Sequence, residues 1–488
     1  MKVRKVISTL GYLLMLFSAT FVFPMIVGAI YDEGPLFVYK AYVLPMMISA
    51  LAGCIMWFNS RNSYEELKER EAYVIVGLGW LLITFSGALP YMTSGAIPNP
   101  IDAYFESMSG FTTTGASVID PAIGDFLTVY PHSIMFWRAL TNWFGGMGII
   151  VLGVVILAKF MHGGIFLFKA EVAGASVTRL RPKLYQTARI LWGVYGFLTG
   201  LCIILYLGAG MPLFHAVCTA MSTLATGGFG LHGDSIGFYA NPAVEAVSIV
   251  FMIIGATNFV LHYRFITGRF KDALEDPELR FFFLWIILLT SFVIMGLALS
   301  ETMGVSGILR NGIYHAVSAG TTTGFSIAND LALWPPFVHI MLVFLMLTGA
   351  TLGSTSGGLK ISRIMILLKN LKNGMIKAIH PRAILSVKVG GKSVPESVVA
   401  RIQILFLIFI LVFVVSVILL CASGIEIVDS VSAVASCLAN CGLSIFGPGY
   451  GFHVLNPFAK VVLTACMWMG RLEIFTALIV LAPSTYKK

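Results

Sequence analysis

Four short stretches rich in threonine and glycine recur along the chain, and their composition suits the binding of a bare cation. They read SGFTTTGAS from Ser109, STLATGGF from Ser222, SAGTTTGFS from Ser318 and SCLANCGLS from Ser436. Rings of backbone carbonyls in such loops can replace the water around an ion. Glycine permits the backbone angles that turn consecutive carbonyls inward, and threonine adds a hydroxyl oxygen. The stretches therefore predict an oxygen-lined filter that selects cations.

The filter is expected to comprise Thr112, Thr113, Thr114, Gly115, Ala225, Thr226, Gly227, Thr321, Thr322, Thr323, Gly324, Asn440, Cys441 and Gly442. Within this set, the residues expected to hold the ion are Thr113, Thr114, Ala225, Thr226, Thr322, Thr323, Asn440 and Cys441. The four key glycines (Gly115, Gly227, Gly324 and Gly442) lie 112, 97 and 118 residues apart. Neighbouring stretches thus leave room for two membrane spans and a cytoplasmic loop between them.

A repeated helical unit must position each stretch. Another glycine follows each key glycine by about 28–30 residues, at Gly145, Gly255, Gly353 and Gly470. We read each unit as an outer helix, a short re-entrant helix, the threonine–glycine loop and an inner helix. The short helices, such as 102–111 and 426–438, would direct their negative C-terminal ends at the pore and favour cations there.

The amino-acid composition indicates a helical membrane protein. Hydrophobic residues make up 58% of the 488 residues and charged residues 11%, whereas soluble domains have roughly 45–50% apolar and 25% charged residues. This balance excludes a soluble protein and a disordered one. Apolar runs long enough to span a bilayer lie at 6–30, 39–58, 72–92, 131–158, 186–208, 241–263, 281–300, 335–352 (continuing less regularly to 371), 399–422 and 456–482.

These ten spans predict an all-α polytopic protein with two N-terminal helices and four helix–pore-loop–helix repeats. The repeats would surround one pore with pseudo-fourfold symmetry. The expected divisions are 1–60 for the two leading helices, then 72–160, 184–266, 279–372 (its inner helix broken by glycines) and 398–482 for the pore repeats.

Basic residues set the expected orientation. They concentrate in 159–189 and 360–401, whereas the opposite loops hold a single basic residue, Arg310. The positive-inside rule therefore places both termini in the cytoplasm. The net charge of +9 is then a cytoplasmic charge and does not indicate nucleic-acid binding. The seven cysteines form no CxxC pair, so we expect free thiols and neither a zinc site nor a cofactor.

A second candidate site lies in the third and fourth inner helices. Segment 349–358 reads GATLGSTSGG, and its glycines should break a transmembrane helix. The break is either a kink accommodated by neighbours or a flexible gate below the filter. The expected gate residues are Gly353, Ser354, Thr355, Ser356, Gly357, Gly358, Lys360 and Arg471.

Arg471 lies in the middle of a span, where a charged residue is costly and usually has a partner. It forms either a structural ion pair, with Glu473 or another acid, or a fixed positive charge that slows cation passage. Arg138 and Lys460 lie nearer the outer ends of their helices. We expect those two side chains to extend along the helix toward the membrane surface.

The four threonine–glycine stretches resemble the four filters of the Trk/Ktr/HKT potassium transporters. Further similarity lies in WFGGMG from Trp143, GSTSGGLK from Gly353 and GRLE from Gly470, and it covers essentially the whole chain. The two leading spans point to the TrkH-type branch of bacteria and archaea. The weakest match is Cys441, which replaces a threonine-like side chain. Gly115, which is not a serine as in sodium-transporting plant members, favours potassium.

The resemblance implies potassium uptake across the inner or plasma membrane through a pore formed by one chain. It also implies homodimers and a cytoplasmic TrkA-type partner ring that binds nucleotides and gates the pore. Potassium would then be the substrate bound at the carbonyls named above, and any nucleotide would lie on the partner subunit. The lipid bilayer would be the other partner, and nucleic acid would not.

Two other functions are considered. A symporter that couples potassium to a proton or sodium ion would need a titratable group in the pathway, for which Glu106, His215 and His315 are candidates. A membrane-embedded enzyme would need a cluster of acids, histidines or a serine–histidine pair at one depth. The predicted spans hold few acids, of which Glu245 and Glu473 are the clearest, so we expect a transporter and not an enzyme.

Overall fold

A computed structural model describes residues 3–60, 69–148, 184–300, 303–328, 331–447 and 450–486. Within these ranges the regular secondary structure is helical apart from one short hairpin formed by β1 (Lys388–Val389) and β2 (Lys392–Ser393). The end of the predicted span 131–158, most of the basic segment 159–189 and the terminal Lys487 and Lys488 lie outside the described residues.

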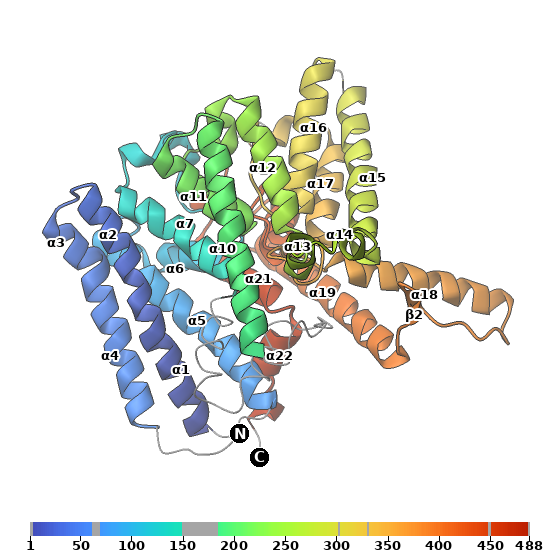
Figure 1. Ribbon diagram of the computed structural model, residues 1–488, viewed down its shortest axis with the longest axis horizontal. Helices are drawn as coiled ribbons and strands as arrows, with labels where there is room; N and C mark the ends of the chain where they lie inside the picture. The colour runs from blue at the N-terminus through green and yellow to red at the C-terminus, as the bar shows by residue number, and fades with distance from the viewer. Residues whose placement is uncertain are drawn as a thin grey trace.

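The first two spans form an antiparallel pair at one side of the molecule (Figure 1). One comprises α1 (Val3–Ser18), η1 (Ala19–Phe21) and α2 (Val22–Ile30), and the other comprises α3 (Pro35–Val38), η2 (Tyr39–Val43) and α4 (Leu44–Phe58). A Cβ on Gly11 would lie 2.6 Å from the carbonyl oxygen of Gly53, and the reverse holds equally. Small residues of this kind allow membrane helices to approach closely.

Four units of similar design follow. The first comprises α5 (Glu69–Ser94), α6 (Pro100–Phe111) and α7 (His132–Gly146), and the second α10 (Leu184–Gly208), α11 (Leu213–Leu224), α12 (Pro242–Gly255), α13 (Phe259–Ile266) and α14 (Phe270–Leu274). The third comprises α15 (Pro277–Leu299), α16 (Val305–Gly320), α17 (Pro336–Thr348) and α18 (Ile361–Ile379). The fourth comprises α19 (Glu396–Ala422), α20 (Ile427–Leu438), α21 (Pro457–Arg471) and α22 (Phe475–Leu481).

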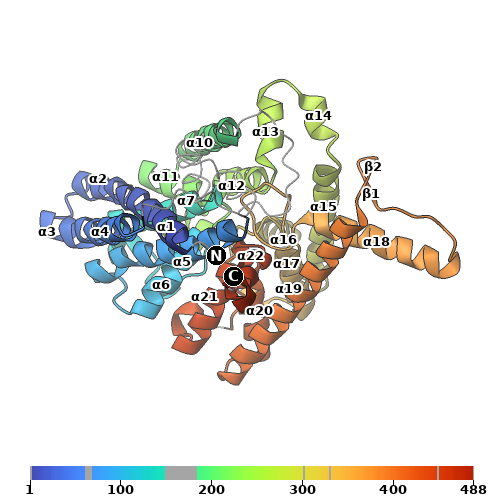
Figure 2. The same ribbon diagram turned by 90° about the horizontal axis from the view of Figure 1, so that it is seen from below.

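Short 3-10 turns complete the connections between these helices and follow the last one. They are η3 (Pro121–Ile123), η4 (Phe126–Thr128), η5 (Ser235–Tyr239), η6 (Leu331–Leu333), η7 (Phe452–Val454) and η8 (Pro483–Thr485). Seen from below, the units surround a common centre, and α18 with the β1–β2 hairpin extends away from it (Figure 2). The fold is therefore the predicted all-α membrane architecture.

Asparagine followed by proline marks the beginning of several pore and inner helices. The side chain of Asn99 accepts a hydrogen bond from the Ile101 N–H at the start of α6, and Asn241 accepts one from Ala243 at the start of α12. Proline at the first helical position needs no backbone partner, and the preceding asparagine caps a free N–H. These signals fix where the helices begin on the outer side.

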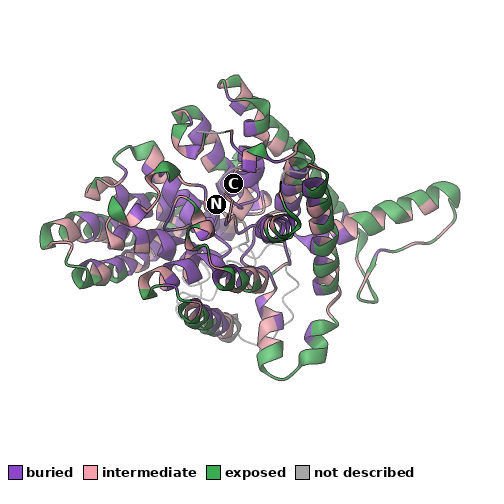
Figure 3. Ribbon diagram, turned by 90° about the horizontal axis from the view of Figure 1, so that it is seen from above, coloured by how far each residue is buried: buried purple, intermediate pink, exposed green. Residues whose placement is uncertain are grey.

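Six helical stretches among the described residues are long and apolar enough to cross a membrane, and two further pairs are bent by 104° and 118°. The bent pairs are α12 with α13 and α21 with α22. Of the other two predicted spans, α7 ends at Gly146, two residues before the described range ends, and α17 ends at Thr348, where the glycine-rich segment begins. Buried residues lie toward the centre and exposed ones on the periphery (Figure 3).

Candidate ion filter and gate

Each threonine–glycine stretch follows the C-terminus of a pore helix, and all four share one backbone pattern. The first residue beyond each cap has a left-handed conformation, with φ of 55° at Thr113, 50° at Thr226, 55° at Thr322 and 52° at Asn440. Two residues later a glycine has φ of 84° at Gly115, 71° at Gly228, 84° at Gly324 and 77° at Gly442. The sequence repeat is therefore also a conformational repeat.

This pattern shifts the second repeat by one residue from the predicted alignment. The counterpart of Gly115 is Gly228, whereas the sequence comparison used Gly227. With Gly228, the serine six residues earlier is Ser222, so all four repeats have serine there. The positions that match Thr113 and Thr114 are consequently Thr226 and Gly227, where the sequence alignment paired Ala225 and Thr226. The ion ligands themselves stay a prediction.

The four loops contact one another in a closed ring. A Cβ added to Gly115 would overlap the carbonyl oxygen of Gly227, and one added to Gly228 would overlap that of Thr323. In the same way, Gly324 lies against the carbonyl of Cys441, and Gly442 against that of Thr114. Each glycine thus packs on the equivalent carbonyl of the next repeat, in the order one, two, three, four and back to one.

Inner-helix glycines support this ring from outside. A Cβ on Gly145 or Gly470 would overlap the carbonyl oxygen of the last residue of a pore helix, Phe111 or Leu438, and one on Gly255 would lie 2.7 Å from that of Leu224. Gly353 does not follow the pattern, because a Cβ there would lie 3.0 Å from the side chain of Asn258. A common packing role against the pore helices therefore applies to three of these four similarly spaced glycines.

The glycine-rich segment 349–360 is a non-helical loop between α17 and α18, and hydrogen bonds attach it to the second unit. Thr355 Oγ1 lies 3.0 Å from the carbonyl oxygen of Leu224 and 2.9 Å from that of Gly255. The Thr351 hydroxyl donates to the Ala256 carbonyl at 2.9 Å. The predicted break in the helix is present, and these hydroxyl groups find partners within the protein, as a loop at membrane depth requires.

The same loop contacts the filter directly. The Gly357 N–H donates to Thr322 Oγ1 at 2.7 Å. The Thr226 hydroxyl lies 3.2 Å from Thr355 Oγ1. Both contacts involve threonines in the left-handed conformation, and all four residues are in the interior of the protein.

Arg471 ends α21 and connects the loop to the first unit. Its guanidinium donates to the carbonyl oxygen of Thr355 at 2.8 Å, to that of Gly146 at 3.2 Å and to that of Gly145. Glu473, considered as a partner from the sequence, forms an ion pair with Arg363 of α18. These hydrogen bonds hold the guanidinium beside the loop.

Lys360 closes the loop with a left-handed backbone, φ 70°. Its Nζ donates to the carbonyl oxygen of Ser356 and lies 3.3 Å from the Ser356 hydroxyl. Ser354 and Ser356 share a hydrogen bond of 2.8 Å. A Cβ at Gly358 would lie 2.8 Å from the Cα of Gly349. The structure therefore brings the predicted gate residues together in one compact loop, with Arg471 beside it.

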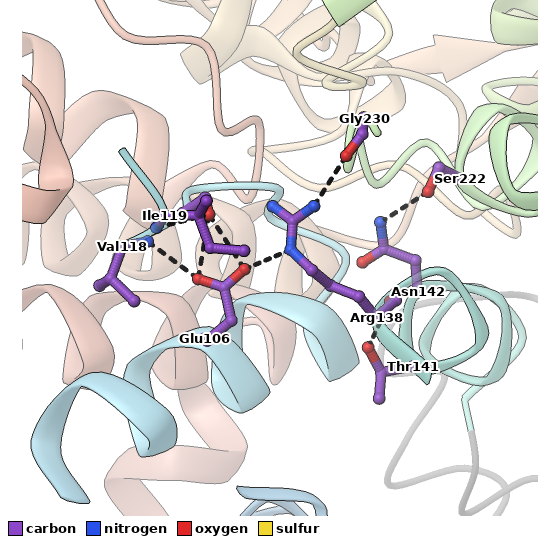
Figure 4. A network of polar contacts seen from close by, with 9 residues as sticks. Glu106, Val118, Ile119, Arg138, Thr141, Asn142, Ser222 and Gly230 are labelled. Atoms are coloured by element: carbon purple, nitrogen blue, oxygen red, sulfur yellow. Dashed lines mark hydrogen bonds and ion pairs between the residues drawn. The ribbon is translucent and has the colours of Figure 1, made fainter. Parts of the chain in front are cut away.

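On the outer side, a buried ion pair within the first unit also contacts the second unit. Glu106 of α6 pairs with Arg138 of α7, whose guanidinium also donates to the Gly230 carbonyl at 2.8 Å (Figure 4). The Glu106 carboxylate further accepts hydrogen bonds from the Ser117 hydroxyl and the Val118 N–H. This network fixes the chain that leaves the first filter to the chain that leaves the second.

The expectation that Arg138 and Lys460 extend toward the membrane surface is wrong. Arg138 is 3% exposed and Lys460 is 5% exposed, and Lys460 Nζ lies 2.7 Å from an Asp102 carboxylate oxygen. A buried charge is stable only with a partner. The acidic residues of the predicted outer loops were the available signal, but spacing alone did not reveal which acid meets which base.

The ring of filter loops presents backbone carbonyl and hydroxyl oxygens as possible ligands. Among the described residues there is no group of three or more histidine, cysteine, aspartate or glutamate side chains placed to hold a metal. Fold and site together define a multi-pass membrane transport protein with a pseudo-fourfold ring of loops. The model of a family described as "TrkH: Cation transport protein" matches residues 39–486.

Relatives resemble the chain over its whole length. The Trk system potassium uptake protein TrkH of Salmonella typhimurium is 36% identical over 500 residues, covering 100% of both chains, and TrkG of Escherichia coli is 35% identical over 98% of this chain and 97% of its own. The crystal structure of the potassium transporter TrkH from Vibrio parahaemolyticus superposes with a TM-score of 0.87 at 35% identity and full coverage of both chains. The chain belongs to the TrkH family, and it is a transporter and not an enzyme.

Proposed function

We propose that this protein takes up potassium through a carbonyl-lined filter, with channel-like passage and a gate formed by the loop 349–360. The observation that carries the proposal is the closed ring in which each filter glycine packs on the equivalent carbonyl of the next repeat. Such a ring supplies oxygens from four sides to a dehydrated ion. The relatives' printed names, potassium uptake proteins, favour potassium as that ion.

The loop supports the gating part of the proposal. Its non-helical backbone is linked to three units at once, through Thr355 and Thr351 to the second, and through Arg471 to the first and fourth. A fixed guanidinium beside the loop repels a cation that has passed the filter. We further infer an inner or plasma membrane location with both termini in the cytoplasm, a homodimer, and opening by a cytoplasmic nucleotide-binding TrkA-type subunit.

The test is ion flux into liposomes that contain the purified protein, under a potassium gradient and then a sodium gradient. Potassium flux along the gradient is expected, and Gly115→Ser should lose selectivity because its side chain overlaps the Gly227 carbonyl oxygen. Equal potassium and sodium flux, unchanged by the substitution, would refute the filter. If flux is absent, adding the regulatory subunit or a proton gradient distinguishes a closed gate from coupled transport.

Coupling to protons or sodium is the alternative, and no contact among the described residues favours it. Glu106, the first candidate for a titrating group, is ion-paired with Arg138. His315 lies 2.9 Å from the Ser326 hydroxyl and 2.9 Å from the Asn311 carbonyl oxygen. A reversal potential that shifts with pH at fixed potassium would replace the channel-like mechanism by symport.

A further inference from the structure

The filter's four left-handed residues differ in what their side chains contact. The Thr113 hydroxyl donates to the adjacent Thr112 carbonyl at 2.7 Å. The Asn440 amide donates to Thr114 Oγ1 at 3.1 Å and to the Met467 carbonyl at 2.9 Å. Among the described side-chain hydrogen bonds of this residue, only those in the second and third repeats reach the gate loop.

Those two contacts connect strained filter residues to the loop. The Thr322 hydroxyl accepts the Gly357 N–H at 2.7 Å, and the Thr226 hydroxyl lies 3.2 Å from that of Thr355. A β-branched residue with positive φ is uncommon and persists only where its surroundings hold it. The docked loop is part of the surroundings that hold Thr226 and Thr322, so moving the loop removes a constraint on the filter.

Gly357 strengthens the connection because no side chain fits at its position. A Cβ there would overlap the Ala439 carbonyl oxygen and lie 2.9 Å from the Cβ of Asn440. The loop backbone therefore lies directly against the start of the fourth filter stretch as well. Displacement of the loop cannot leave the adjacent filter residues with the same contacts.

We infer that Thr226 and Thr322 are positioning residues that couple the gate loop to the filter, so that potassium in the filter favours the docked, closed loop. This inference rests on the proposed function. Docking holds the filter loops in the ring geometry and so raises their affinity for potassium. Coupling between two sites is reciprocal, so bound potassium must stabilise docking by the same factor. External potassium would then reduce opening of its own uptake route.

The experiment records currents from purified protein in planar bilayers, with potassium replacing sodium on the outer side. In the wild type, open probability is expected to fall as external potassium rises. Thr322→Val removes the acceptor of the Gly357 N–H but keeps the shape and β-branching. It should raise open probability about threefold to tenfold at high potassium, a factor that matches one net hydrogen bond, and weaken the potassium dependence.

Thr113→Val is the matched control, because it makes the same change at the same filter position without a loop contact. Thr113 is an expected ion ligand, as Thr322 is, so Thr113→Val should shift the potassium concentration at which opening falls, but the fall at saturating potassium should stay as large as in the wild type. Thr226→Val provides a second loop-side variant if Thr322→Val does not fold. Equal potassium dependence in the loop-side and control variants would overturn the coupling, whereas a wild type without potassium-selective current would overturn the proposed function.

Discussion

At the residue scale, the ring assigns different roles to the two adjacent glycines of the second filter. Gly228 has φ of 71°, and its added Cβ would overlap the Thr323 carbonyl oxygen. Gly227 does not have a positive φ, and the three atoms nearest to its added Cβ would be those of the Asn142 amide group, at 2.5–2.9 Å. Backbone cannot move aside as a side chain can, so Gly228 should tolerate substitution far less than Gly227.

We therefore expect Gly228→Ala to reduce potassium flux at least tenfold and Gly227→Ala to reduce it less. The left-handed backbone alone costs a substituted residue about 1–2 kcal/mol, to which the overlap adds. Liposome flux at matched protein content measures both variants. Equal losses of flux in the two variants would contradict the assignment of Gly228 as the counterpart of Gly115.

Arg471 allows a separate test of the gate. Its hydrogen bonds to Thr355 and to the carbonyls of Gly145 and Gly146 hold the loop, and each charged hydrogen bond contributes about 1.5–3 kcal/mol. Arg471→Gln should raise flux in the absence of a partner by about tenfold or more. Arg471→Lys keeps the charge without the fork of donors, and unchanged flux in both variants would exclude a role for this side chain in closing the pore.

At the element scale, the outer connections of the first and second units meet at a histidine. His232 is 2% exposed, stacks on Phe238 with ring centroids 3.5 Å apart, and places Nδ1 3.4 Å from an Asp125 carboxylate oxygen. Its Nε2 lies 3.3 Å from Nδ1 of His215. Burial lowers the pKa of His232 to about 4, although the nearby Asp125 opposes the shift and His215 adds to it.

The sign of the pH effect follows from this shift. In the unfolded chain, His232 binds a proton near the ordinary histidine pKa of about 6.5. In the folded protein, its pKa is lowered to about 4. Stability should therefore fall as pH falls through this window. Between pH 7 and pH 4.5, the thermal midpoint in detergent should drop less in His232→Gln than in the wild type. The variant keeps the neighbours Asp125, Asp234 and Tyr239, so only the histidine titration is removed. An equal drop in both proteins would refute the contribution.

Helices and their order were predictable because apolar runs, asparagine–proline starts and glycine breaks are local signals. The one-residue shift to Gly228 was missed because ATGG allows two alignments. The serine six residues earlier favours Gly228, and the backbone angles decide between the two. The partner of Arg471 was also beyond reach. Its described acceptors are backbone carbonyls of the first and third units, which have no residue-type signature, and Glu473 instead pairs with Arg363.

At the scale of the whole molecule, side-chain contacts between the first and fourth units close the circle of repeats. Lys460 pairs with Asp102 at 2.7 Å with side-chain exposures of 6% and 24%, whereas His453 lies 3.7 Å from Asp120 with exposures of 19% and 49%. Both contacts join the same two units. Burial of the first pair should make it far more important, because removing one partner leaves a charge out of water.

Lys460→Met should lower stability by about 3–5 kcal/mol, and His453→Gln by no more than about 1 kcal/mol. A double-mutant cycle with Asp102→Asn measures the coupling of the buried pair, and one with Asp120→Asn provides the matched surface comparison. Similar coupling energies in the two cycles would contradict the expected dependence on burial.

The ring has one further property because a single gene encodes all four of its quarters. A substitution in a channel built from four identical subunits changes every quarter at once, whereas here Gly115, Gly228, Gly324 and Gly442 can be altered one, two or three at a time. The number of substituted repeats, which is the dose of the defect, can therefore be varied in an experiment. Ion selectivity plotted against that dose would reveal whether discrimination fails in steps or collapses with the first defect, a distinction that no identical tetramer can offer.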